Sequence, residues 1–117
     1  MSMKLATREV SGVTIVDLSG KITLGEGGVT LREEVRKLLA EGKKKIALNL
    51  AEVNYIDSGG LGTLVSLYTS ARNAGGAVKL ASLSQRVGDL LQVTKLLTIF
   101  EVFDSEEEAA RSFANVA

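Results

Sequence analysis

The order in which strand-like and helix-like segments follow one another constrains the fold most. Two strand patterns open the chain, "KLATREV" and "TIVDLSG", and Ser11-Gly12 between them is a turn signal. Three more strand patterns follow, each between helical segments, at residues 45–50, 77–83 and 98–103. Strands that alternate with helices pair in parallel through right-handed crossovers. The order predicts an α/β fold, with an opening β-hairpin and a mixed, mostly parallel sheet packed with about four helices.

The helices are predicted from the spacing of apolar residues and from capping residues. The first is expected from about Thr30 to Glu41, because Thr30 and Glu33 match a capping box and Gly42 suits a helix end. The preceding segment, Gly25–Gly28, is predicted to be a flexible loop. The other helices are expected from Asp57 to about Ala74, after Ser84, and after Asp104 or Ser105.

Composition limits the classes of function. The length of 117 residues predicts one domain, residues 1–117. Fourteen basic residues balance 14 acidic ones, which argues against a nucleic-acid binder. The chain has no His and no Cys, and its carboxylates show no ligand-like spacing, so we expect no metal and no cofactor. No apolar run reaches ~18 residues and no signal peptide is visible, which favours a cytoplasmic protein without a membrane span.

The stretch "YIDSGGLGTL", residues 55–64, is the candidate site. With Asp57 as the N-cap, Ile56 and Leu61 stand at the positions of a hydrophobic staple, and the Asp57 carboxylate can accept a backbone N–H of Gly59 or Gly60. With Ser58 as the cap, the staple partner would be a glycine. The first register is therefore favoured, and it places Ser58 in the first helical position with its hydroxyl pointing away from the core.

Three interpretations of this stretch compete. A helix N-terminus carries partial positive charge and free N–H groups, so Ser58 can carry a phosphate there. Gly59 and Gly60 leave the surface bare, so a partner can approach. A serine nucleophile needs a base, usually His, and the chain has none, which disfavours a hydrolase and predicts no catalytic residue. The third interpretation is a capped helix start and nothing more.

A resemblance shifts this balance. The segment "LNLAEVNYIDSGGLGTLVSLY" resembles the signature of the STAS domain family, and specifically the bacterial anti-sigma factor antagonists, whose motif is similar to "YIDSSGLG". The segments "VTIVDLSGKI" and "TKLLTIFEVFDSEEEA" are also similar to family elements. The resemblance implies a single STAS domain that is not an enzyme. It implies that the unmodified protein sequesters an anti-sigma factor serine kinase, that this kinase phosphorylates Ser58, and that a phosphatase reverses the modification.

The chain departs from the family pattern at two places beside Ser58. Gly59 stands where the family often has Ser or Thr, which leaves Ser58 as the one acceptor in the motif. The acidic "GELD" loop is replaced by "GKIT", which ends at Thr23. The partner-binding residues implied by the motif are therefore Asp57, Ser58, Gly59, Gly60, Leu61 and Thr23. An alternative is a STAS scaffold or accessory subunit of a transport or signalling assembly, without a phosphorylation switch. Nucleotide binding by Gly25–Gly28 is a weaker third possibility.

Overall fold

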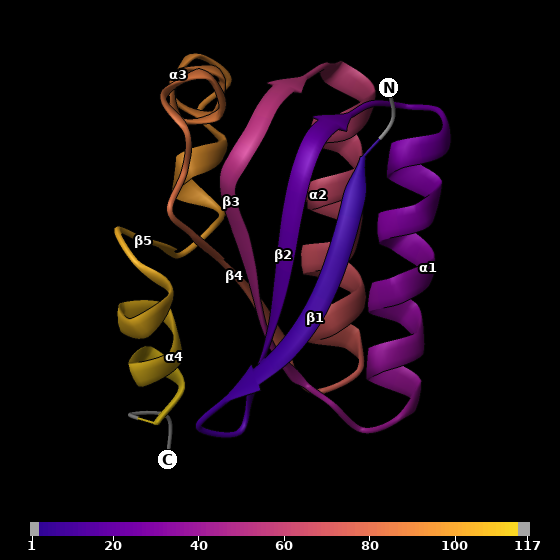
Figure 1. The fold of residues 1–117 in the computed structure, drawn as a ribbon, viewed down its shortest axis with the longest axis vertical. Coiled ribbons are helices and arrows are strands. Elements are labelled where there is room, and N and C mark those ends of the chain that lie inside the picture. Colours follow the sequence, from indigo (N-terminus) through magenta and orange to yellow (C-terminus); the bar gives the residue numbers. More distant parts are fainter. Residues whose placement is uncertain (1–2, 115–117) are drawn as a thin grey trace.

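The structure, a computed structural model, describes residues 3–114 as a five-stranded sheet with the first three α-helices packed into one core cluster and the fourth into another (Figure 1). Its strands are β1 (Lys4–Val10), β2 (Val13–Ile22), β3 (Lys45–Ile56), β4 (Ala77–Ala81) and β5 (Val102–Phe103). Its helices are α1 (Glu26–Ala40), α2 (Ser58–Asn73), α3 (Gln85–Val93), the 3-10 helix η1 (Leu96–Thr98) and α4 (Glu106–Ala114). The strand order is β1-β2-β3-β4-β5, with β1 and β2 antiparallel and the other pairs parallel. The predicted α/β fold is confirmed.

Apolar residues cover both faces of the sheet, as expected for parallel strands that helices bury on both sides. Helices α1 and α2 pack on one face, where Leu31, Val35 and Leu64 are fully buried against the strands. Helix α4 covers part of the other face and buries Ala110 and Phe113 in a second, smaller cluster. Within residues 3–114, no helix has the length and apolar character needed to cross a membrane.

The start of α1 differs from the prediction. The helix begins at Glu26 after an N-cap at Gly25, so the capping box at Thr30 and the flexible loop at Gly25–Gly28 were wrong. The first turn lies against the backbone that leaves β2. A β-carbon on Gly27 would lie 2.7 Å from the carbonyl oxygen of Lys21, and one on Gly28 would lie 2.5 Å from that of Thr23. The glycines therefore allow a close helix–strand contact, which their spacing in the sequence does not reveal.

Two strand predictions also needed correction. Strand β3 continues past residue 50 to Ile56, because its second half pairs with the end of β2 and buries Val53 and Ile56. The last strand, expected over 98–103, contains Val102–Phe103 only. The left-handed conformation of Lys95, with φ of 63°, leads into η1, and this turn buries Phe100 against the core before β5 begins. The predicted cap of α3 at Ser84 is confirmed by its hydrogen bond from the Val87 amide (3.4 Å).

A polar network joins β1, β2 and β3 to the start of α4. The guanidinium of Arg8 donates to both carboxylate oxygens of Asp17, at 2.7 and 3.1 Å, and to Glu106 at the start of α4 (2.6 Å). The side-chain amide of Asn49 donates to Asp17 at 2.8 Å. The hydrogen bond from Arg8, followed by the one from Asn49, lowers the pKa of Asp17 against the opposing effect of burial.

This network predicts a pH-dependent contribution to stability. Because the pKa of Asp17 is lower in the folded chain than in the unfolded one, its contribution is complete above about pH 4 and disappears as the pH falls through the lowered value. We expect Asp17→Asn to reduce the free energy of unfolding by about 1 kcal/mol or less at pH 7, since the pair is partly exposed. Urea unfolding should show this difference at pH 7 and a smaller one at pH 3.5.

The matched control is Glu9→Gln. Glu9 lies on the same hairpin as Asp17, and its exposed carboxylate is 3.3 Å from the ammonium of Lys43. This variant should change stability less than Asp17→Asn does. A difference between Asp17→Asn and the wild type that stays constant from pH 7 to pH 3.5 would contradict the assigned role of the Asp17 charge.

Candidate functional site

The candidate site lies where β3 ends and α2 begins, at the same edge of the sheet as the end of β2 (Figure 1). Asp57 is the N-cap of α2, and its carboxylate accepts a hydrogen bond from the Gly60 amide at 2.8 Å. The carbonyl of Asp57 accepts from the Leu61 amide at 2.9 Å. Ile56 and Leu61 are buried in the same core cluster, as a hydrophobic staple requires. The predicted register of the helix start is confirmed.

Ser58 is the first residue of α2 and is exposed. The residues around it are held firmly, because Asp57 satisfies one free amide of the first turn and Leu61 anchors that turn in the core. A hydroxyl at this position is open to solvent and stands close to the positive end of the helix dipole. Chemically, the arrangement suits an acceptor of a negatively charged group.

The two glycines after Ser58 face the protein itself. A β-carbon on Gly60 would overlap the carbonyl oxygen of Ile22 and lie 2.8 Å from Ile56 Cγ1. A β-carbon on Gly59 would overlap the side chain of Leu24 and lie 2.8 Å from its Cα. Gly60 is buried and Gly59 is partly buried. Both positions are therefore restricted to glycine by the packing of α2 against the end of β2 and the loop that follows.

The loop between β2 and α1 brings a residue to the site that sequence reasoning missed. Leu24 lies against Gly59 and its side chain is 72% exposed, so it adds apolar surface beside the start of α2. Thr23, the predicted contact residue, is partly buried next to Leu24, and its carbonyl accepts from the Gly28 amide at 3.1 Å. The signal in the sequence was a leucine between polar residues and glycines, but its nearness to Gly59 depends on the tertiary fold.

A second connection runs from α1 to the same helix start. Thr63 is 1% exposed, and its hydroxyl donates to the carbonyl of Gly59 at 3.1 Å. The guanidinium of Arg32 donates to the Thr63 hydroxyl at 3.2 Å. The backbone next to Ser58 is thus held through α2 and α1 as well as by the Asp57 cap.

Two cations lie over the ring of Tyr55, three residues before Ser58. Tyr55 lies at the end of β3, and its ring has the ammonium of Lys21 at 5.8 Å and the guanidinium of Arg86 at 5.6 Å from its centre. Tyr55, Lys21 and Arg86 are all exposed. These cations come from β2 and α3, which meet the end of β3 at this edge of the sheet.

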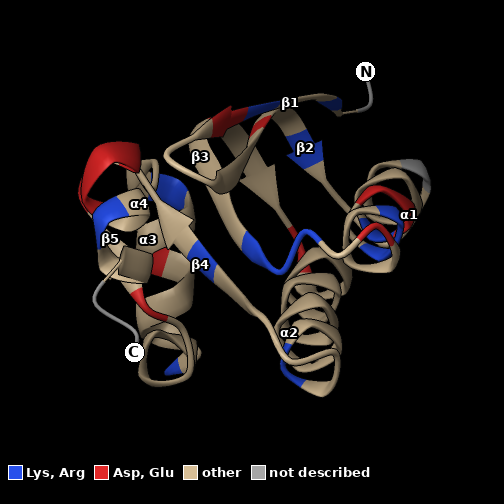
Figure 2. Ribbon diagram, turned by 90° about the horizontal axis from the view of Figure 1, so that it is seen from below, with Lys and Arg blue, Asp and Glu red and all other residues tan. Residues whose placement is uncertain are grey.

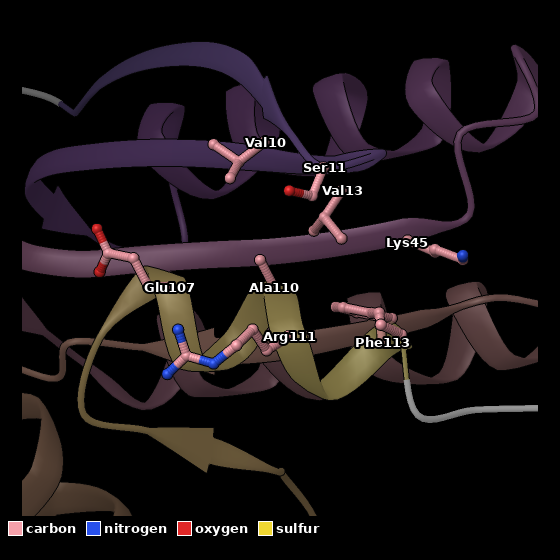
Figure 3. A pocket seen from close by; sticks show the side chains of 9 residues that line it. Val10, Ser11, Val13, Lys45, Glu107, Ala110, Arg111 and Phe113 are labelled. Carbon is pink, nitrogen blue, oxygen red and sulfur yellow. The ribbon is translucent and has the colours of Figure 1, made fainter.

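Among the described residues, neither a metal-binding group of acidic side chains nor the hollow beside α4 involves Ser58. Within residues 3–114, no three acidic side chains are grouped in a way that could hold a metal ion. A hollow of about 320 Å³ lies between the β1–β2 turn and α4, lined by Val13, Ala110 and Phe113 among others (Figure 3). Val13 begins the strand that Ile22 ends, so this hollow is at the opposite end of the sheet from Ser58.

Comparison with known proteins agrees with this architecture. The STAS domain family model matches residues 4–109. The anti-sigma-B factor antagonist of Bacillus subtilis is 33% identical, over 79% of this chain and 83% of its own. A Bordetella bronchiseptica protein assigned as an anti-sigma factor antagonist is 28% identical over 95% of each chain. The crystal structure of a Thermotoga maritima protein with the same assignment has a TM-score of 0.84 and 28% identity, covering 92% of each chain.

Proposed function

The chain belongs to the STAS domain family, and on this premise we propose that it is an anti-sigma factor antagonist controlled by phosphorylation of Ser58. In its unphosphorylated form it binds and sequesters an anti-sigma factor that is also a serine kinase. Phosphorylation of Ser58 ends this binding, and a phosphatase restores it. The protein acts in the cytoplasm as a ligand and a substrate rather than as an enzyme.

The observation that carries this proposal is the exposed hydroxyl of Ser58 in the first position of α2, next to a cap that Asp57 provides. A phosphoryl group on this oxygen adds about −1.5 to −2 charges at pH 7. The positive end of the helix dipole tolerates that charge, and no buried group has to move to make room for it. Phosphorylation would therefore change the surface while the fold stays intact, as a reversible switch requires.

The proposed contact surface has exposed and buried parts. Ser58 and Leu24 face solvent, and Thr23 lies next to them partly buried. Gly60 and Leu61, which the family motif also implicates, are buried and serve the interface by fixing the backbone that carries Ser58. Leu24 gives the surface an apolar residue beside the acceptor, which suits a partner that closes over Ser58 and excludes water.

The proposal is tested by capturing the partner and then asking whether it modifies Ser58. A Ser58→Ala bait, incubated with extract of the source cell, should retain a protein with a serine kinase domain. The purified partner with Mg²⁺ and ATP should then add one phosphate to the wild-type chain, and peptide mass spectrometry should place it on Ser58. Ser70, exposed near the other end of α2, is the internal control and should stay unmodified.

Other outcomes separate the alternatives. A partner that binds wild-type, Ser58→Ala and Ser58→Asp baits equally and transfers no phosphate would replace the switch by a constitutive scaffold role. Phosphate on other serines and none on Ser58 would overturn the assignment of the acceptor while leaving the antagonist role to be judged by binding.

A further inference from the structure

A second candidate site lies at the end of the sheet opposite Ser58, where β3 and β4 begin. A hollow of about 390 Å³ opens there between the starts of these strands, the α2–β4 turn and the end of α4. Lys44, Lys45 and Lys79 line it together with Glu101 and Phe113. Figure 2 views the molecule from this end, with a basic stretch between α1 and β3 and a basic band on β4. The hollow therefore gathers cations from two neighbouring strands.

Lys79 forms the buried part of this site. It is 4% exposed, although it sits in the middle of β4 with its side chain on the face that α4 covers. Its ammonium donates to the Ser112 hydroxyl at 2.9 Å and lies 4.3 Å from the centre of the Phe113 ring. An ammonium removed from water costs several kcal/mol unless opposite charge compensates it. Whether the hollow attracts an anion depends on how much of the Lys79 charge is balanced by negative groups of the chain itself.

That compensation is incomplete. The carboxylate of Glu101 is 3.5 Å from the Lys79 ammonium, but the Glu101 side chain is 63% exposed, so solvent screens the pair. Lys44 and Lys45 add two exposed cations to the same hollow. Three lysines and one glutamate thus line the hollow, and a bound dianion would balance their charge. Lys43, next in the chain, pairs instead with Glu9 on the hairpin, at 3.3 Å.

The apolar part of the lining indicates what else the ligand carries. Ala77 and the edge of Phe113, which is 4% exposed, form the apolar part of the lining beside the three lysines. The backbone offers little polarity here, because the amides of Gly75, Gly76 and Ala77 already donate to carbonyls of the chain. Side chains would therefore make the polar contacts, and an apolar group of the ligand would lie against Ala77 and the small exposed edge of Phe113.

We propose that this hollow binds a small organic phosphate whose phosphate lies among Lys44, Lys45 and Lys79 and whose apolar group lies against Ala77 and the exposed edge of Phe113. The neighbouring hollow of Figure 3 shares Lys45 and Phe113 but differs in its charges. There Glu107 and Arg111 lie at the end away from Lys45, so the cations do not meet at one point. The site is independent of the Ser58 switch, since the two are at opposite ends of the parallel strands.

The test measures binding of phenyl phosphate and of inorganic phosphate to the full chain by NMR titration. Phenyl phosphate should shift the amide signals of Lys44, Gly75, Gly76 and Lys79, and it should bind at least about threefold more tightly than inorganic phosphate. The double variant Lys44→Ser, Lys45→Ser should bind at least about tenfold more weakly. The test replaces these exposed lysines because replacing the buried Lys79 risks unfolding the chain.

Lys43→Ser is the matched control, because it removes an exposed lysine from the same run outside this hollow. It should leave the affinity unchanged within about twofold. Equal weakening by Lys43→Ser and by the double variant, or shifts spread over lysines in all parts of the surface, would overturn the site. Equal affinity for the two phosphates would overturn the part played by the apolar lining of Ala77 and Phe113. None of these results bears on phosphorylation of Ser58.

Discussion

Ser58→Asp is expected to lower the affinity for the captured anti-sigma factor at least about a hundredfold. An interface that closes over Ser58 would have to remove water from the new carboxylate without a positive group to pair with it, which costs several kcal/mol. Titration calorimetry with the purified partner measures the loss directly. Ser58→Ala should bind as tightly as the unphosphorylated wild type, since the methyl group carries no charge into the interface.

Folding stability separates this effect from damage to the domain. An Asp in the first turn of α2 lies near the positive end of the helix dipole, so it should leave the melting temperature unchanged or slightly raised. Ser70→Asp adds the same charge at the other end of the same helix and should leave binding intact. Affinity of Ser58→Asp within threefold of the wild type would refute the charge-exclusion mechanism.

Gly60→Ala is expected to destabilise the fold by about 3 kcal/mol, the upper end of the usual cost of overpacking a tight core. The new methyl group would overlap the carbonyl oxygen of Ile22 and press on Ile56. Neither residue moves easily, because Ile22 and Ile56 are register partners at the ends of β2 and β3. Urea unfolding should show the loss as a lower midpoint, and the melting temperature should fall by roughly 10–20 °C.

Gly62→Ala provides a control of opposite sign on the same helix. Position 62 is exposed, and a β-carbon there meets no atom within 4 Å. Alanine is a better helix former than glycine, so this variant should gain roughly 0.5–1 kcal/mol. If Gly60→Ala proved as stable as Gly62→Ala, the close contact between α2 and the end of β2 would be wrong.

Local chemistry made the Asp57–Ser58 helix start predictable. A capping carboxylate, the amide it accepts from and the staple pair lie within six residues, so the register can be chosen without the rest of the fold. The same local logic failed at α1, where Thr30 and Glu33 imitate a capping box. The true start at Glu26 depends on Gly27 and Gly28 fitting against the backbone of β2, a tertiary contact.

The contacts of the site that join different helices and strands could not be predicted from the sequence. Leu24 touches Gly59 across 35 positions of the chain, and Arg32 reaches Thr63 through a hydrogen bond of 3.2 Å. Likewise, alternation along β4 marks Lys79 as lying on the side away from Val78 and Leu80. Only the position of α4 shows that this side is covered. These long-range contacts depend on how the helices pack on the sheet.

The contact between Leu24 and Gly59 restricts the order in which mutations can accumulate in this lineage. The motif that the chain resembles often carries a second hydroxyl after the acceptor serine. A mutation that places Ser or Thr at position 59 first would meet the backbone of Leu24 and destabilise the start of α2. After a change that draws the loop away, the same mutation would be nearly neutral. The two positions should therefore evolve as a pair, with the loop changing first.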